Sequence, residues 1–317
     1  MTNKIDVNTR SFNALESLQD RAEEYGLTVT FDQEACILDF GVSSKGGIHA
    51  GIELAKCSCG DLVKVNLVHQ RIADRNYSAV QVSTDHPLLA CIGSQYAGWP
   101  VQYGDFFAMG SGPIRALRGQ EKILEEFDLL QESPKGVICL ETSRIPPTET
   151  LTNIAKEAEI DPCQLKVAVA PTSSIAGSIQ VIARSVETAM HKLHELGFDL
   201  ASVNSGIGVA PIPPIANDDL KGIGLTNDSI LFGGQVNLWV DADQNQIDEI
   251  GPQIPSSSSE DYGTPFYDLF KTKEFNFYEI DPLLFSPAEI TIHNLNSGQS
   301  KTFGGVNEKL LHESFGF

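Results

Sequence analysis

Short apolar runs and segments with helical signals alternate along the chain. Four apolar runs predict β-strands, and they cover residues 27–31, 36–40, 136–140 and 166–170. Residues 147–158 begin with Pro and Thr, which suit the first turn of a helix, and residues 174–196 repeat apolar side chains at helical spacing. Strands that alternate with helices are typical of layered α/β proteins. The pattern therefore predicts an α/β fold with mixed β-sheets flanked by helices.

The length of the chain predicts more than one domain. Its 317 residues compare with roughly 150 residues in a typical domain. We expect one α/β part at residues 1–145, which carries a Gly-rich loop, and a second at residues 146–317, which carries the helix at 174–196. No linker or repeat marks this boundary, so it stays open whether each part is continuous.

The helix expected at residues 174–196 has two different faces. At 100° per residue, one stripe is apolar and consists of Ile175, Ile179, Ile182, Val186, Ala189, Leu193 and Leu196. The opposite side carries Gln180, Arg184, Glu187 and His191. Arg184 and Glu187 are three residues apart, so their side chains can meet. The spacing leaves two interpretations open: a solvated face with a weak surface ion pair, or a cleft-facing carboxylate that activates water.

A Gly-rich segment at residues 104–117 is a second candidate for chemistry. Gly110 and Gly112 allow the backbone to come close to a ligand, and Pro113 suits the start of a helix that continues through Ala116 and Leu117. Exposed amides at such a start attract anions or carbonyl oxygens. The segment matches neither a phosphate-binding P-loop nor GxGxxG, so an ordinary Gly-Pro turn and a ligand loop both remain open.

Charge and cysteine content exclude several functional classes. There are 22 Lys and Arg against 42 Asp and Glu, a formal net charge of −20. Such acidity argues against binding nucleic acid or anionic membranes, and favours solubility, with a cationic ligand as the alternative. Among six cysteines only Cys57 and Cys59 form a close pair, without a second pair or a His-x-x-x-His partner, so no metal site is expected. Residues 1–6 have no apolar segment, and we expect a cytoplasmic protein.

Four segments, in order, closely resemble the methenyltetrahydromethanopterin cyclohydrolase family. They are residues 104–117 (GDFFAMGSGPIRAL), 183–189 (ARSVETA), 208–214 (GVAPIPP) and 225–234 (LTNDSILFGG). The resemblance implies two α/β parts with a cleft between them, a homotrimer, and no metal or prosthetic group. It implies a hydrolase of one-carbon metabolism, found in methanogenesis and formaldehyde oxidation. Such an enzyme reversibly converts the methenyl cation of a tetrahydromethanopterin-type carrier to its N5-formyl form.

The resemblance also assigns roles to single residues. The family's proposed catalytic Arg and Glu, three residues apart on a helix, correspond to Arg184 and Glu187. Glu187 is then the general base for water, and Arg184 keeps it ionised and oriented. Polar groups on the Gly-rich loop and beyond it are expected to bind the substrate, and these are Asp105, Ser111, Gly112, Arg115, Asn204 and Gln235. Two alternatives stay open: the same hydrolysis on a folate carrier, and a pterin-binding or assembly protein without catalysis.

Overall fold

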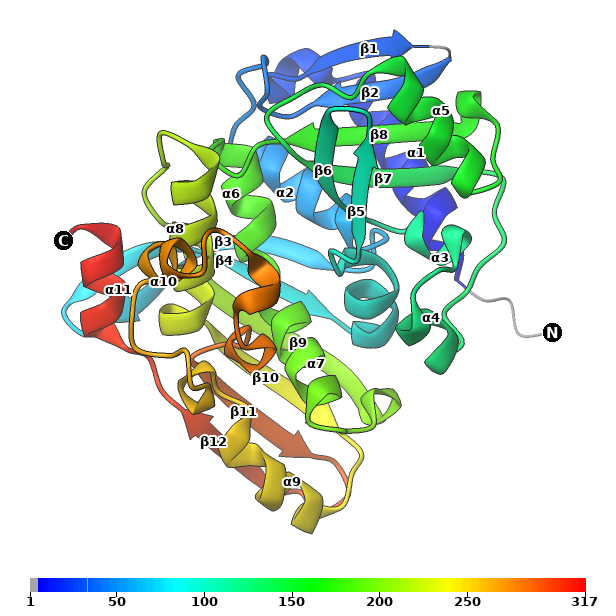
Figure 1. Ribbon diagram of the computed structural model, residues 1–317. Helices are drawn as coiled ribbons and strands as arrows, with labels where there is room; N and C mark the ends of the chain where they lie inside the picture. The colour runs from blue at the N-terminus through cyan, green and yellow to red at the C-terminus, as the bar shows by residue number, and fades with distance from the viewer. Residues whose placement is uncertain (1–4, 33) are drawn as a thin grey trace. The chain divides into compact units, whose positions relative to one another are not determined.

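The computed structural model describes residues 5–32 and 34–317, which form two compact units (Figure 1). The first unit comprises the chain up to Val63 together with Leu89–Gln180. The second comprises Lys64–Leu88 and Val181–Phe317. Each unit contains one six-stranded mixed sheet, which confirms the predicted α/β fold class. The domain boundary near residue 145 stays a prediction.

The sheet of the first unit has parallel strands at its centre and hairpins at its edges. In order across the sheet, the strands are β1 (Thr28–Asp32), β2 (Ala35–Asp39), β8 (Leu165–Ala170), β7 (Gly136–Glu141), β6 (Phe106–Ser111) and β5 (Trp99–Tyr103). Strands β2, β8 and β7 run parallel, whereas β1 with β2 and β5 with β6 form antiparallel hairpins. The strands predicted at residues 27–31 and 36–40 are therefore confirmed as the hairpin β1–β2, and the strands predicted at 136–140 and 166–170 are confirmed as the central strands β7 and β8.

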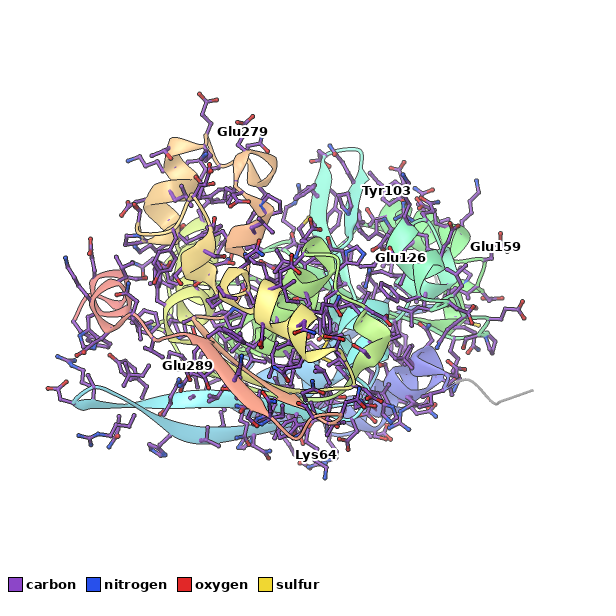
Figure 2. The ribbon with its side chains drawn as sticks, turned by 90° about the horizontal axis from the view of Figure 1, so that it is seen from below. Lys64, Tyr103, Glu126, Glu159, Glu279 and Glu289 are labelled. Atoms are coloured by element: carbon purple, nitrogen blue, oxygen red, sulfur yellow. The ribbon has the colours of Figure 1, made fainter. Side chains whose placement is uncertain are left out.

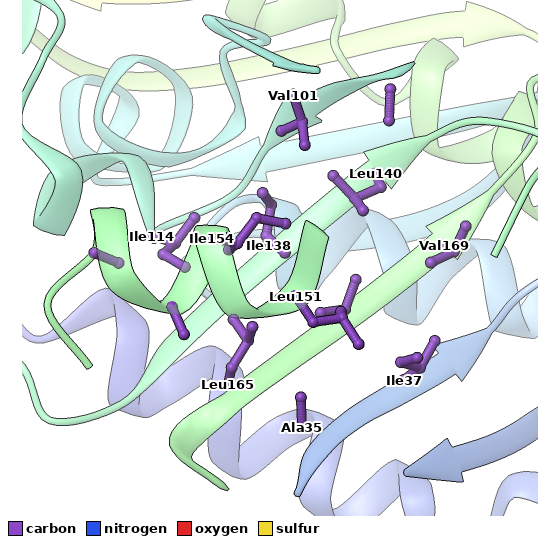
Figure 3. Close-up of a cluster of buried hydrophobic side chains, with 14 of the residues drawn as sticks. Ala35, Ile37, Val101, Ile114, Ile138, Leu140, Leu151, Ile154, Leu165 and Val169 are labelled. Atoms are coloured by element: carbon purple, nitrogen blue, oxygen red, sulfur yellow. The ribbon is translucent and has the colours of Figure 1, made fainter. Parts of the chain in front are cut away.

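Helices cover both faces of this first sheet. Its helices are α1 (Val7–Gln19), α2 (Ile48–Ser58), α3 (Arg115–Arg118), α4 (Lys122–Glu126) and α5 (Thr148–Glu157), and α6 (Ile175–Ile182) crosses into the second unit. Leu15 of α1 packs in a cluster with Ala168 of β8. On the opposite face, Leu151 of α5 belongs to a cluster with Val169 of β8 (Figure 3). Every residue of β8 is buried because both of its faces are covered.

The sheet of the second unit is mostly antiparallel. In order, its strands are β12 (Ser300–Gly304), β11 (Glu289–Asn294), β10 (Gln235–Val240), β9 (Val203–Pro211), β4 (Arg75–Thr84) and β3 (Lys64–Ile72). Only β10 and β11 are parallel among the described strands of this sheet. The helices of this unit are α7 (Ser185–Glu195), α8 (Asp219–Gly233), α9 (Gln244–Ile250), α10 (Phe266–Thr272) and α11 (Glu308–Phe315).

Two predicted elements differ from the structure in where their helices and strands begin and end. The single helix expected at residues 174–196 is interrupted at Ala183 and Arg184, because the Arg184 N–H donates to Val181 O (3.0 Å), a tighter turn than an α-helix makes. The apolar stripe continues through this break, so periodicity alone does not reveal it. The apolar residues at 229–240 also predict a pair of strands, but the first half of this segment is helical, since α8 extends through Gly233. A fully buried apolar run fits strand and helix equally well.

No helix within the described residues is both long enough and apolar enough to span a membrane.

A buried carboxylate joins three helices of the second unit. Asp228 on α8 is 1% exposed, and it accepts hydrogen bonds from the Phe266 N–H at the start of α10 (2.8 Å) and from the Ser314 hydroxyl on α11 (2.5 Å). Burial raises the pKa of Asp228 to about 7, above the ordinary 3.8, although these two hydrogen bonds oppose the increase. The protonated form is therefore favoured in the folded protein.

We expect Asp228→Asn to change how stability depends on pH. A raised pKa contributes stability that is complete below pH about 4 and is lost as the pH rises through about 7. An Asn side chain keeps the geometry without titrating. The free energy of unfolding of wild type minus that of the variant should therefore fall between pH 4 and 7, measured by urea unfolding. A difference that stays constant over this range would contradict the assignment.

Candidate active site

The break between α6 and α7 determines where Arg184 and Glu187 lie. Arg184 is the N-cap residue of α7, with non-helical φ −87° and ψ 8°, and its carbonyl accepts from the Thr188 N–H (2.8 Å). Glu187 lies in the first turn of α7. The positive end of the helix dipole favours a negative charge there. The two residues are thus one turn apart at a helix start rather than in the middle of a long helix.

Both side chains are withdrawn from solvent. Arg184 is 8% exposed and Glu187 is 5% exposed, and Gln180 on the same polar side is also 5% exposed. Both charged residues have interaction partners within the structure. Charged groups are almost never this deeply buried unless they are paired or functional. The interpretation of this side as a solvated helix face is therefore wrong. The other interpretation of the spacing remains, in which Glu187 is a carboxylate protected from solvent and Arg184 is its cationic neighbour.

Two glycines of β9 determine how closely the start of α7 approaches the sheet. A Cβ atom at Gly208 would lie 2.2 Å from Ser185 Oγ, and one at Gly206 would lie 2.8 Å from Val186 Cγ1. Real Cβ contacts are essentially never so short. The residues that separate Arg184 from Glu187 along the chain therefore rest directly on the β9 backbone, and this contact fixes the first turn of α7.

The predicted substrate-binding residues of the first unit do not form one group. Asp105 lies in the β5–β6 turn, where its side chain is 90% exposed and its carboxylate is 3.3 Å from Arg144. Ser111 is at the other end of β6 and is 3% exposed. A strand rises about 3.3 Å per residue, so roughly 20 Å separates the two. The structure brings Ser111 together with Gly112 and Arg115, but not with Asp105.

Arg115 is fully buried and extensively hydrogen-bonded. Its guanidinium donates to both carboxylate oxygens of Glu121, to Ile92 O (3.1 Å) and to Ser94 O (3.2 Å), and it lies over the Tyr96 ring. These contacts use four of the five N–H groups of an Arg side chain. The arrangement holds the π-helix η2 (Leu88–Gln95) against α3. A role of Arg115 in substrate binding stays a prediction.

Gly112 is required by packing inside the first unit. Its φ is +99°, and an added Cβ would lie 3.0 Å from Val137 O. Its N–H donates to Ser94 O (2.8 Å). These constraints account for the glycine without a ligand, and its proposed contact with substrate remains untested.

Asn204 and Gln235 lie at opposite ends of two paired strands. Gln235 pairs with Val209, whereas Asn204 is five residues before Val209 on β9. At about 3.3 Å per residue, this places them roughly 17 Å apart. Gln235 accepts from Gln70 (3.1 Å) and donates to Glu289 (2.7 Å). The two residues therefore cannot bind the same small group, and their individual roles stay predictions.

Polar residues at the carboxyl ends of the parallel strands are absent from the sequence-based prediction. Glu141 ends β7 and accepts a hydrogen bond from Thr172, which follows β8, and Asp39 ends β2. Ligands of open α/β sheets commonly bind at this edge. A polar residue directly after a buried apolar run is the signal that would have found them.

Asp39 has a structural function at this edge. Its carboxylate accepts from the backbone N–H groups of residues 41–44, at 2.7–2.9 Å. Burial opposes ionisation, but these hydrogen bonds outweigh it and hold the pKa of Asp39 below its ordinary value. The Asp39 carboxylate thus stabilises the loop that follows β2.

Only one group of side chains among the described residues could share a metal ion. It consists of Glu34, Asp161 and Cys163, all exposed, in the first unit. Arg184 and Glu187 belong to the second unit.

A layered α/β fold that buries a carboxylate and a guanidinium on one helical turn is typical of an enzyme, because buried charges cost stability and are concentrated at functional sites. Comparison with known proteins identifies the family of enzymes. The profile of the Cyclohydrolase (MCH) family matches residues 6–315, so this chain belongs to that family.

Three relatives that match 89–98% of the chain are each named methenyltetrahydromethanopterin cyclohydrolase. The protein of Rhodopirellula baltica is 47% identical over 287 residues, which are 89% of this chain and 86% of that protein. The protein of Methanococcoides burtonii is 40% identical over 98% of each chain. The protein of Methylobacillus flagellatus is 38% identical over 98% of this chain and 95% of that protein.

Gly208→Ala should displace the first turn of α7. The added methyl group overlaps Ser185, and overpacking of this kind typically costs about 1–3 kcal/mol of unfolding free energy. Gly305→Ala is the matched control, because no atom lies within 4 Å of a Cβ built at Gly305. Urea unfolding of both variants tests the contact. Equal stability of the two variants would show that β9 does not position α7 through Gly208.

Proposed function

We propose that this chain hydrolyses the methenyl cation of a tetrahydromethanopterin-type carrier to the N5-formyl form, in a reversible reaction. Membership of the Cyclohydrolase (MCH) family and the names of the relatives support this substrate. The observation that carries the mechanism is the burial of Arg184 and Glu187 at the start of α7. The relatives' names also favour a methanopterin carrier over folate.

Glu187 acts as the general base for water in this proposal. The water oxygen bonds to the methenyl carbon while one water proton passes to the Glu187 carboxylate. The bond from this carbon to the second nitrogen then breaks, and that nitrogen takes a proton from Glu187 or from water. The hydroxyl proton leaves as the formyl C=O forms. One cation and one water thus give a neutral formyl compound and one proton.

Electrostatics favours a carboxylate in this role. The methenyl carbon lies between two nitrogens of a cation and is already electrophilic, so we propose a reaction that uses neither a metal nor a cofactor. A negative charge attracts the cation, more strongly where water is excluded than in bulk solvent. The net charge of −20 adds a weak long-range attraction.

Arg184 orients Glu187 and keeps it ionised in this proposal. A neighbouring guanidinium lowers a carboxyl pKa, which preserves the charge but weakens the base. The larger contribution of Arg184 is therefore positioning, since correctly placed reactants lower the barrier through entropy. Arg184 is the N-cap residue of α7, so its backbone directly precedes the first turn, which carries Glu187.

We also propose which residues bind the substrate and how the chain assembles. Ser111, Gly112 and Arg115 are proposed to contact the pterin or its tail as one group, and Asp105, Asn204 and Gln235 as separate contacts. A homotrimer in the cytoplasm is proposed on the resemblance to the family. The non-catalytic alternative, a pterin-binding or assembly protein, predicts binding of the methenyl compound without loss of its near-ultraviolet absorption.

Glu187→Gln should lower kcat by about 10²–10⁴-fold, the usual contribution of a general base, with little change in KM. Glu195→Gln is the matched control, because Glu195 ends the same helix and its side chain is 36% exposed. The assay follows the near-ultraviolet absorption of methenyl-tetrahydromethanopterin, with the methenyl folate compound in parallel. A kcat of Glu187→Gln within twofold of wild type would remove Glu187 from the mechanism.

A further inference from the structure

The helix α7 carries a further buried charge that the proposed mechanism does not use. Lys192 lies in its last turn and is 0% exposed. Other charged side chains point into solvent, as those of Lys64, Glu126 and Glu279 do in Figure 2. A lysine is almost never fully buried unless it is paired. The position of Lys192 therefore needs an explanation from its contacts.

The Lys192 ammonium joins α7 to two short 3₁₀ helices of the same unit. It donates to the hydroxyl of Ser258 (3.2 Å), which ends η6 (Ser256–Ser258). It also donates to the carbonyl of Leu283, which lies in η8 (Pro282–Leu284). Both acceptors are neutral oxygens, so the ammonium is hydrogen-bonded at a buried position without a carboxylate as acceptor.

Both acceptors are themselves held in place. The Leu283 N–H donates to Asp281 (3.0 Å), whose carboxylate also accepts from the Ser259 hydroxyl (2.5 Å). The Ser258 hydroxyl lies within hydrogen-bonding distance of two backbone carbonyls that precede it in the chain, at 2.6 and 2.8 Å. Two fixed oxygens therefore define where the ammonium lies, and with it the last turn of α7.

Stability alone does not explain a lysine at this position. Burial lowers the pKa of Lys192 to about 8 from the ordinary 10.5, although the charge of Asp281 opposes the change. The buried charge thus costs free energy, in full below pH about 8, and the cost disappears as the pH rises towards 10.5. Apolar replacements of buried charges are often neutral or stabilising. What the ammonium adds is one defined position, because hydrogen bonds are directional.

The apolar side of α7 leaves room for a small rotation about the helix axis. Its buried apolar residues are Val186, Ala189, Met190 and Leu193. Ala is small and Met adapts to different surroundings, so such a side can pack in more than one way. A rotation of about 10° moves an atom that is roughly 5–6 Å from the axis by about 1 Å. Displacements of this size can lower the rate of a reaction about 10²-fold.

We propose that Lys192 is a positioning residue, which fixes the rotation of α7 and thereby aligns Glu187 with the reacting carbon. The inference rests on the proposed function, because it assigns Glu187 the role of base. The packing of β9 against the first turn sets how closely α7 approaches the sheet. The hydrogen bonds of Lys192 set which way its polar side faces.

Lys192→Met removes the ammonium and keeps a side chain of similar length. We expect kcat to fall about 10–100-fold, because Glu187 is no longer aligned. KM should stay within about twofold, since a fully buried side chain does not contact the substrate. Tm should change by less than about 4 °C, because the lost hydrogen bonds and the removed cost of burial oppose each other. The absorption assay and thermal unfolding followed by circular dichroism measure these quantities.

Ser258→Ala tests the same contact from the other partner. It changes an exposed residue and removes one of the two acceptors, so kcat should fall by less than in Lys192→Met. In the double variant Ser258→Ala should have no further effect, since the ammonium through which it acts is gone. Lys166→Met is the matched control. Lys166 is a lysine of the first unit that is 3% exposed and donates to Gln19 (2.9 Å), and kcat of this variant should stay within about twofold of wild type.

A purely structural role of Lys192 predicts a lower Tm with unchanged kcat, and that result would overturn the inference. So would kcat values of Lys192→Met and Ser258→Ala that both lie within about twofold of wild type, or an equal fall in Lys166→Met. If Lys192→Met does not fold, Ser258→Ala decides by the same limit. A wild type that does not hydrolyse the methenyl compound contradicts the proposed function and the inference with it. An active wild type with unaffected variants contradicts the inference alone.

Discussion

The close contact between the start of α7 and the backbone of β9 is the constraint on which the candidate site depends. Gly206 and Gly208 leave no side chain in the space that Val186 and Ser185 occupy. Where the start of a helix packs directly on a sheet, its distance from the sheet and its direction are fixed, because deforming either closely packed backbone costs free energy. Arg184 and Glu187 flank these two residues along the chain. Their positions are therefore determined by the packing of the second unit itself.

Burying two opposite charges is rarely the best way to stabilise a fold. Desolvation of an ion pair often cancels its attraction, and apolar replacements can be equally stable. Asp228 shows the purely structural case, in which a carboxylate joins three helices and its pKa rises because burial favours the neutral form. Arg184 and Glu187 are similarly buried, but they lie at a helix start, where the dipole supports an ionised carboxylate. A base for water requires that ionised form.

The strong acidity of the chain has a consequence for the proposed activity. It adds attraction for a cationic substrate, and it also makes self-association unfavourable wherever carboxylates gather.

The sequence by itself determined the fold class and the central strands of the first sheet, because apolar periodicity is a local property. The candidate pair Arg184 and Glu187 followed from the resemblance of residues 183–189 to the family, and its catalytic role stays a prediction. Only the tertiary structure decided that the helix breaks at Ala183 and Arg184, since the apolar stripe is continuous across the break. It also decided that the polar side of this helix is buried, and that Asp105 lies about a strand length from Ser111. Burial and separation depend on what packs against a segment, and the segment's own residues do not encode that.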